Sequence, residues 1–359
     1  MPKTGHAGTR RIGAPGIAVA IIAIMIAAGS ARAADPATVA KIATYQANDR
    51  QAFLEAGARR EGALLVYTVG AQIDPVVKAF DAKYPYLAVK TFKNDIPTLL
   101  AKTFEEYKAG VYNADVFEIE DYGLRILLDA KMLAPFFSPE MVHYPADAIE
   151  PGKRWALMRE DYASLGFNTD AYSGEQVPQT HMDLLDPKWK GKLGVSATES
   201  TLANWVGAML VGEGEDFVRR LGRQNLTLYN LGGRAVSNLV VSGEVPLVVN
   251  SRYSHMYASR RDGAKVSWRA LGPSYAAVSG VAVPVRSQNP HAAMLFADFL
   301  LSAAAQKIYT EELGYASLRS DMASATAPAK KLYLGLRPNY TAEYESWSQL
   351  ADQVFRSGR

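Results

Sequence analysis

The sequence contains no cysteine among its 359 residues. This absence excludes disulfide bridges, thiolate metal sites, cysteine nucleophiles and a lipid anchor on an N-terminal cysteine. The chain must be stabilised by its hydrophobic core, and its length suits two domains or lobes. Because 39 basic and 36 acidic residues leave a formal net charge of only +3, and no run of five basic residues occurs, composition gives no argument for nucleic-acid binding.

The motifs of common enzyme classes are missing as well. The sequence has no G-x-S-x-G, H-E-x-x-H, Walker or G-x-G-x-x-G pattern. The histidines that follow the N-terminal segment are isolated: His143, His181, His255 and His291. We therefore expect a protein that is not an enzyme and has no cofactor. An exported enzyme on a two-lobed fold is an alternative, because a fold does not determine a function.

An uncharged apolar run, GIAVAIIAIMIAA, occupies residues 16–28. Three basic residues precede it: Lys3, Arg10 and Arg11. Residues 31–33 (Ala-Arg-Ala) have the small-x-small pattern of a cleavage site. The run is short for a hydrocarbon layer of about 30 Å, so we favour a cleaved signal peptide at 1–33 over a permanent anchor. The pattern leaves open whether export follows the general or the twin-arginine route, and we expect a periplasmic protein.

The rest of the chain reads as two successive α/β units. Strand-forming runs at 64–68, 87–92 and 115–119 alternate with helical patterns at 74–85 and 97–110. A second unit has strands at 192–195, 226–230 and 245–250 and helices at 197–210, 215–221 and 235–244, the last of which we expect Gly243 to cap. We also expect a helix over 35–60, a strand at 280–285 and a long helix over 291–313. Pro284 indicates that the strand at 280–285 is an edge strand or ends there. No flexible linker separates the units, which suggests two lobes joined by crossover strands with a cleft between them.

Four segments in order resemble the periplasmic solute-binding proteins of ABC importers. They are LEAGARREGALLVYT (54–68), DPKWKGKLGV (186–195), SGEVPLVVNSRY (242–253) and the stretch at 280–321. The branch most similar to them binds ferric iron, and its relatives bind thiamine, phosphonates and sugar phosphates. The resemblance covers roughly residues 50–321.

The resemblance implies a two-lobed α/β fold in which each lobe is a mixed, mostly parallel sheet flanked by helices. Two crossover strands would join the lobes, which close on a ligand by a hinge motion. Lobe 1 would comprise residues 34–140 plus 268–325, and lobe 2 residues 141–267 plus 326–359. The expected partners are a small solute, an ABC permease and its ATPase, for a monomeric receptor. A sensory protein that presents its ligand to a membrane receptor is an alternative role.

The strand at 245–250 leads into Arg252 and Tyr253. In the iron-binding relatives this strand ends in adjacent tyrosines that coordinate Fe(III), and here Arg252 stands in the first tyrosine's place. A guanidinium beside the cation would be repelled by roughly 4 kcal/mol per unit charge at 4 Å and an effective dielectric near 20. Arg252 suits a carboxylate or phosphate instead. We expect a small anionic solute, with Arg252 as counter-charge and Tyr253 as donor; an exposed arginine beside a half-buried tyrosine is the bland alternative.

Further candidates follow from strand ends, helix starts and the resemblance: Thr68, Glu118, Asp121, Ser200, Thr201, Asn204, Trp205, Arg234 and Tyr257. A helix start near Ser200 would offer unpaired N–H groups to an anion, or would simply be capped. Glu118 and Asp121 could bind a metal or an ammonium group, or pair with Arg252 or Arg234. Under the ferric alternative, Tyr253 and Tyr257 would converge with one of these carboxylates and a synergistic anion.

Overall fold

The computed structural model describes residues 33–70, 73–322 and 330–357. The predicted signal peptide therefore lies outside the described residues, apart from Ala33. None of the helices in the described ranges combines the length and apolar character needed to cross a membrane.

The first elements alternate as the sequence predicts. They are α1 (Pro36–Ala43), α2 (Arg50–Glu61), β1 (Ala63–Thr68), α3 (Asp74–Lys83), β2 (Ala88–Lys93), α4 (Ile96–Lys108), β3 (Val116–Glu120), α5 (Asp121–Asp129) and β4 (Leu133–Ala134). Strand β1 pairs in parallel with both β2 and β3, so the predicted β-α-β-α-β unit is confirmed. The single helix expected over 35–60 is wrong. The chain leaves α1 at Thr44, whose hydroxyl donates to the Ala40 carbonyl, and α2 begins after Asp49.

The middle of the chain contains one long strand that the sequence analysis missed. The elements are β5 (Ala156–Asn168), β6 (Gly194–Ser196), α6 (Glu199–Glu213), α7 (Glu215–Gly222), β7 (Thr227–Tyr229), α8 (Gly233–Ser242), β8 (Leu247–Arg252), α9 (Tyr253–Arg261) and β9 (Val266–Arg269). Helix α8 ends at Gly243, which has a φ of 80°, as its predicted capping role requires. Helix α9, which begins inside the polar stretch after β8, was also missed.

The last elements are β10 (Ser274–Pro284), α10 (Pro290–Leu301), α11 (Ala303–Lys307), β11 (Ala316–Ser317), β12 (Lys331–Leu332) and α12 (Tyr340–Ala351). Short 3-10 or π-helical turns lie at Pro139–His143, Ala146–Ala148, Met182–Leu185, Pro187–Trp189, Ile308–Glu312, Leu334–Leu336 and Asp352–Arg356. Strand β10 ends at Pro284, as expected. The predicted helix over 291–313 is instead broken at Ser302, whose hydroxyl donates to the Phe299 carbonyl and accepts from the N–H of Ala305.

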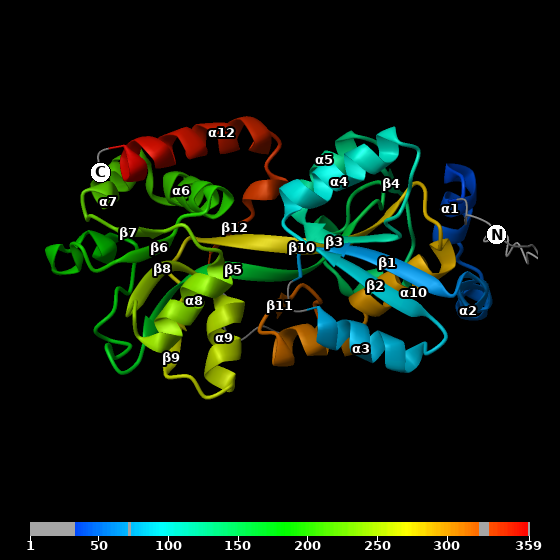
Figure 1. Ribbon diagram of the computed structural model, residues 1–359, viewed down its shortest axis with the longest axis horizontal. Helices are drawn as coiled ribbons and strands as arrows, with labels where there is room; N and C mark the ends of the chain where they lie inside the picture. Colours follow the sequence, from blue (N-terminus) through cyan, green and yellow to red (C-terminus); the bar gives the residue numbers. More distant parts are fainter. Residues whose placement is uncertain (1–32, 71–72, 323–329, 358–359) are drawn as a thin grey trace, which may run out of the picture. The chain divides into compact units, whose positions relative to one another are not determined.

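Within the described residues the strands form a single mixed sheet. Its main order is β2-β1-β3-β10-β5-β8-β6-β7, with β4 and β12 paired to β10 and β9 and β11 paired to β5. Pairing is parallel within β2-β1-β3 and within β8-β6-β7, and antiparallel where β10 meets β3 and β5 and where β5 meets β8. Figure 1 shows β5 and β10 side by side between the two groups of parallel strands.

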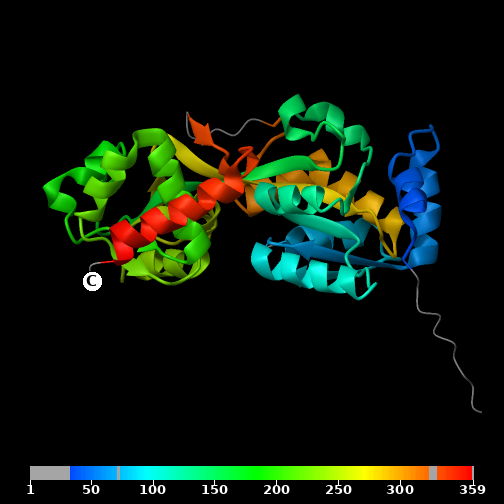
Figure 2. The ribbon, with the colours of Figure 1, turned by 90° about the horizontal axis from the view of Figure 1, so that it is seen from above.

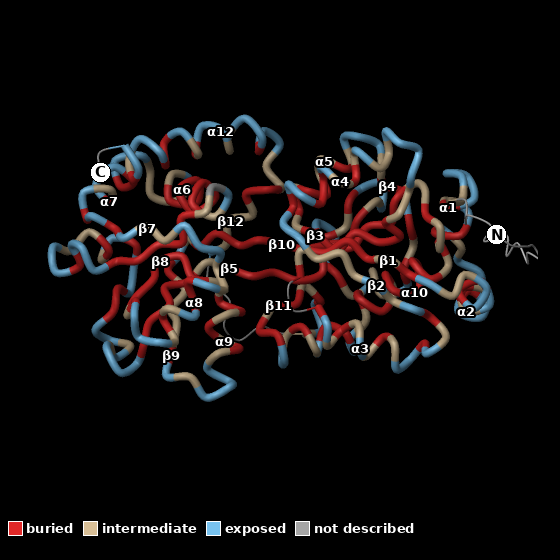
Figure 3. Tube along the Cα trace, in the orientation of Figure 1, coloured by how far each residue is buried: buried red, intermediate tan, exposed pale blue. Residues whose placement is uncertain are grey.

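Two large clusters of buried apolar side chains flank this crossing. One gathers residues from 39–158 and 278–313, and the other gathers residues from 165–277 and 334–355. Strands β5 and β10 contribute to both, with Met158 and Val278 in the first cluster and Leu165 and Ala277 in the second. In Figure 3 the crossing strands are buried while the flanking helices keep exposed outer faces. We propose that these clusters are the cores of the two lobes; the predicted lobe boundaries stay a prediction.

The C-terminal segment is a further connection between the elements that form the first buried cluster and those that form the second. Strand β12 pairs with the start of β10, the turn at Leu334–Leu336 contacts α5, and α12 then packs on α6. Figure 2 shows α12, in red, lying over the green helices of the second group. Trp347 is buried where α12 meets α6, because Gly207 leaves room for its ring.

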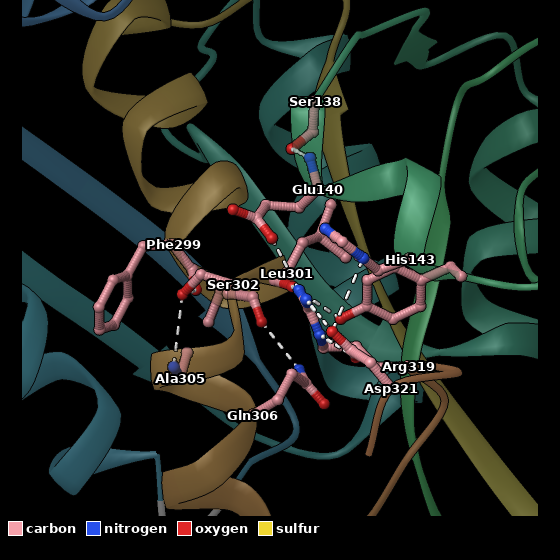
Figure 4. Close-up of polar contacts among 12 residues, drawn as sticks. Ser138, Glu140, His143, Phe299, Leu301, Ser302, Ala305, Gln306, Arg319 and Asp321 are labelled. Carbon is pink, nitrogen blue, oxygen red and sulfur yellow. Dashed lines mark hydrogen bonds and ion pairs between the residues drawn. The ribbon is translucent and has the colours of Figure 1, made fainter.

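A buried arginine anchors the chain after β11. The side chain of Arg319 is only 3% exposed and donates to both carboxylate oxygens of Asp321, at 2.9 and 2.8 Å. It also donates to Glu140 at 2.7 Å and to the Leu301 carbonyl at the end of α10 at 2.8 Å. Figure 4 shows these groups converging on one guanidinium, with His143 beside Asp321. The arrangement satisfies a helix-terminal carbonyl and neutralises the charge.

Candidate functional site

A cavity of about 130 Å³ lies where several strands end. It is lined by Val69, Asp95, Ile96, Glu120, Tyr122, Ser200, Thr201, Asn204, Arg252 and Tyr275. Val69 follows β1, Glu120 ends β3, and Arg252 ends β8. In open α/β sheets, ligands bind in the crevice beyond the carboxyl ends of parallel strands. The cavity therefore has the expected position of a ligand site, and residues of both core groups line it.

Arg252 lies at the junction of β8 and α9, which fixes its backbone. Its side chain keeps 20% exposure, so it reaches the cavity rather than bulk solvent. One terminal nitrogen donates to the Asp161 carbonyl at 3.4 Å, and the guanidinium lies 5.4 Å from the centre of the Tyr275 ring. The other terminal nitrogen lies 3.9 Å from a Glu120 oxygen. The guanidinium is oriented but only loosely paired, so it retains hydrogen-bonding capacity for a ligand.

Glu120 and Asp95 are the acidic residues that line this cavity, and the sequence analysis missed both; Glu120 is the one beside Arg252. Its side chain is 22% exposed. Burial raises the pKa of the Glu120 carboxyl, while the nearby Arg252 and Arg159 charges lower it. For Arg252, burial lowers the pKa, but Glu120 and neighbouring groups raise it above its ordinary value. Its position in the sequence could have identified Glu120 as a candidate, because it is the last residue of a parallel strand, where ligand contacts are expected.

The first turn of α6 forms another wall of the cavity. Thr198 precedes the helix without capping it, because its hydroxyl donates to the Thr201 hydroxyl at 2.8 Å. Asn204 donates to the Ser200 carbonyl at 3.0 Å and accepts from the Tyr340 hydroxyl at 3.1 Å. The side chains of Ser200, Thr201 and Asn204 thus line the cavity beside a helix start that has no side-chain cap. Unpaired N–H groups and the helix dipole favour negative charge there.

Trp205, one residue further along α6, is 3% exposed and packs against Phe355. It does not line the cavity. The structure therefore places Trp205 in the second core, and its proximity to the helix start in sequence was a weak guide. The helical rotation of about 100° per residue turns it away from its predecessor Asn204.

Thr68, Glu118 and Asp121 do not line the cavity either. Glu118 is fully buried and accepts two hydrogen bonds from Arg159, at 3.1 and 2.5 Å, as well as one from the Thr68 hydroxyl. Asp121 is 2% exposed at the start of α5, and burial together with Glu120 raises its pKa to about 8. One oxygen of Asp121 accepts from the N–H of Tyr122, and the other has no partner. These carboxyls belong to the protein interior.

The two predicted tyrosines lie behind Arg252. Tyr253 is 5% exposed and its ring stacks on Tyr162, with centroids 4.6 Å apart. Tyr257 lies 5.8 Å from Tyr253, ring centre to ring centre, and donates from its hydroxyl to the Glu311 carbonyl at 3.2 Å. Neither lines the cavity. In the described ranges, no group of three or more His, Cys, Asp or Glu side chains is placed to hold a metal ion.

Arg234 lines a second cavity of about 690 Å³, together with Lys93, Asn94 and His255. This cavity shares Val69 and Asp95 with the first. The structure thus brings Arg252, Ser200, Thr201 and Asn204 together in one cavity and places Arg234 in its neighbour.

Comparisons with known proteins identify the family and the fold of this chain. The profile of the family described as bacterial extracellular solute-binding protein matches residues 120–334. The Fe(3+)-binding periplasmic protein of Serratia marcescens is 25% identical over 210 residues, or 54% of this chain; the match spans only 61% of that relative's length.

Solved structures show the same fold. Iron-bound HitA from Pseudomonas aeruginosa superimposes with a TM-score of 0.67 and 22% identity, covering 81% of this chain and 99% of HitA. AfuA from Actinobacillus pleuropneumoniae, bound to fructose-6-phosphate, gives a TM-score of 0.66 and 17% identity, with 83% and 99% coverage. The predicted two-lobed periplasmic binding protein fold is thereby confirmed. With a profile match over more than half of its length, this chain belongs to the bacterial extracellular solute-binding protein family.

Proposed function

We propose that this protein is the periplasmic receptor of an ABC importer and captures a small anionic solute, an organic carboxylate or phosphate. The observation that carries the proposal is that Arg252 and the uncapped start of α6 line the same cavity. Both favour negative charge, and they come from different strand ends of the sheet. The signal-peptide pattern at residues 1–33 supports export, and family membership supports a permease and its ATPase as partners.

The solute would bind more tightly when the two core groups are close together, because it would then contact both of them. A solute held by Arg252 and α6 on one side and by residues near Val69 and Asp95 on the other contacts both core groups. Such contacts favour the arrangement in which the groups are close. No bond of the solute needs to break, so the residues act by charge and hydrogen bonding alone, in a monomeric receptor without a cofactor.

The test is a thermal-shift screen of the purified protein against carboxylates, phosphates, vitamins and metal salts, followed by calorimetric titration of each hit. Because a solute that binds only the native state raises the melting temperature, hits identify the class. Replacement of Arg252 by Gln should weaken the affinity for the best anion by about tenfold or more, since hydrogen bonds to charged groups contribute roughly 1.5–3 kcal/mol. Arg223→Gln, which removes an exposed arginine from a different surface pocket, is the matched control. Unchanged affinity in Arg252→Gln would contradict the proposal.

Ferric iron with a synergistic anion is the second candidate, because the Serratia relative is named an Fe(3+)-binding protein and the HitA structure is iron-bound. Tyr253 and Tyr257 would have to turn toward the cavity and reach the metal. Addition of ferric salt with phosphate should then give a visible phenolate-to-iron absorption band that Tyr253→Phe weakens. Absence of the band, with an anion bound, favours the first candidate.

A further inference from the structure

Arg234 has no ion-pair partner among the described residues, although the charges of Asp161 and Asp262 act on it at longer range. It is the second residue of α8, and one terminal nitrogen makes only a 3.5 Å hydrogen bond to the His255 carbonyl. Its other terminal nitrogen is buried and has no hydrogen-bond partner. Across the described part of the chain, no carboxylate is within ion-pair distance of it. Leaving a partly buried cation unpaired is unfavourable, and burial accordingly lowers the pKa of Arg234.

The other charged groups lining the second cavity already have partners. Lys93 forms an ion pair with Asp74. Asp95 caps α4, where one oxygen accepts from the N–H of Thr98 at 3.0 Å. Of the two cationic side chains in this lining, Lys93 is thus ion-paired and Arg234 is not, which leaves Arg234 available to an anion.

His255 connects the two arginines. A methyl group added at Gly233 would meet the His255 ring at 3.4 Å and the Arg252 side chain at 3.5 Å, so these groups pack closely around the start of α8. Burial and the charges of Arg234 and Arg252 lower the pKa of His255 to about 3, and the ring is neutral at ordinary pH. Its Nδ1 atom is buried without a partner. A neutral hydrogen-bonding group thus stands between two cations that line adjoining cavities.

We infer that the solute carries two separate acidic groups, one held by Arg252 in the first cavity and the other by Arg234 in the second. The linking part of the solute would pass Val69 and Asp95, which line both cavities, while His255 lines the second cavity beside Arg234. This inference rests on the proposed function and narrows it, from small anions in general to dicarboxylates, bisphosphonates or phosphorylated acids. The shared residues Val69 and Asp95 are where the two cavities adjoin.

The experiment is calorimetric titration of the full-length purified protein with linear dicarboxylates and bisphosphonates of three to seven carbons, each beside its monoacid analogue. The best diacid should bind at least about tenfold more tightly than its monoacid, a difference of 1.4 kcal/mol. Arg234→Gln should remove that preference and leave monoacid affinity within about twofold, whereas Arg252→Gln should weaken both probes about tenfold or more. Arg223→Gln should behave like the wild type.

The outcomes separate the two claims. If Arg252→Gln weakens every acid but Arg234→Gln changes none, the anion receptor stands and the second subsite is wrong. If both variants bind all probes as the wild type does, both claims are wrong. A thermal-shift series with inorganic phosphate gives an independent readout. The phosphate-induced rise in melting temperature should persist in part in Arg252→Gln and vanish in the variant that combines Arg252→Gln with Arg234→Gln. A protein that binds no probe and shows no phosphate effect overturns the second subsite.

Discussion

Arg319 is buried and Arg234 is partly buried, and the two arginines have opposite surroundings. Arg319 contacts two carboxylates and a helix-terminal carbonyl, so its charge and its donors are satisfied by the protein. Arg234 has one long hydrogen bond and a buried nitrogen without a partner. The comparison separates an arginine that holds the fold from one whose partner must come from outside. Arg252 lies between these extremes, since in the described residues Glu120, at 3.9 Å, is the one carboxylate within ion-pair distance of it.

The largest effect is expected at the most completely buried ion pair. Arg159 and Glu118 have side-chain exposures of 4% and 0%. Replacement of Arg159 by Met should lower the free energy of unfolding by about 3–5 kcal/mol, because it leaves an unpaired carboxylate in the core. Chemical denaturation measures the loss. The control is the double replacement Arg159→Met with Glu118→Leu, which should recover most of it; a double variant as unstable as the single one would contradict the explanation.

A smaller loss of stability is expected at Arg319, and comparing it with Arg234 tests the difference between the two arginines directly. Arg319→Met should cost about 2–3 kcal/mol, less than the fully buried pair because Glu140 and Asp321 are partly exposed. Arg234→Met should change stability by less than about 1 kcal/mol, or increase it, since it removes a charge that has no partner. Denaturation of both variants at the same low ionic strength gives the comparison. Equal losses at the two positions would show that Arg234 has a structural role.

The last prediction concerns affinity rather than stability, and tests the pH dependence of binding at the intermediate case, Arg252. An anion bound to Arg252 adds negative charge beside Glu120, whose pKa burial already raises, so binding should take up a proton. Affinity should therefore rise as the pH falls from 8 toward 5, by at most about tenfold per unit for one proton. Glu120→Gln should strengthen binding and flatten the profile. Asp121, with a pKa of about 8, is the other group that could titrate, and Asp121→Asn tests it. Affinity that rises with pH would contradict the assignment.

The sequence predicted the fold where periodicity and residue type agree. The alternating unit from β1 to β3 and the glycine cap of α8 follow from local patterns. Strand β5 was missed because Arg159, Glu160 and Asp161 look like a solvated loop, while in the structure partners far along the chain neutralise or bond them. Local sequence does not contain that information.

The site was predictable to a similar degree. Arg252 ends β8 and α6 starts soon after β6, and the rule that ligands bind beyond strand ends predicts that the two lie near one another; both line one cavity. That this cavity holds the ligand stays a prediction. The same rule favours Glu120 over Glu118 and Asp121, but it requires knowing where β3 ends to within one residue. Whether a given arginine is paired depends in part on residues far along the chain, such as Glu140 for Arg319 or Glu120 for Arg252, and only coordinates reveal it.

The three charged residues of β5 also fix the register of that strand in the sheet. Arg159 bonds Glu118, Glu160 bonds Lys331 and Tyr333, and Asp161 accepts from Ser254 at the start of α9. Sliding β5 by one position would turn each of these side chains to the opposite surface and leave all three interactions broken at once. Pairing of β5 with its neighbours in a shifted register is thereby strongly disfavoured. The same charged residues that made β5 hard to recognise in the sequence therefore fix its register in the sheet.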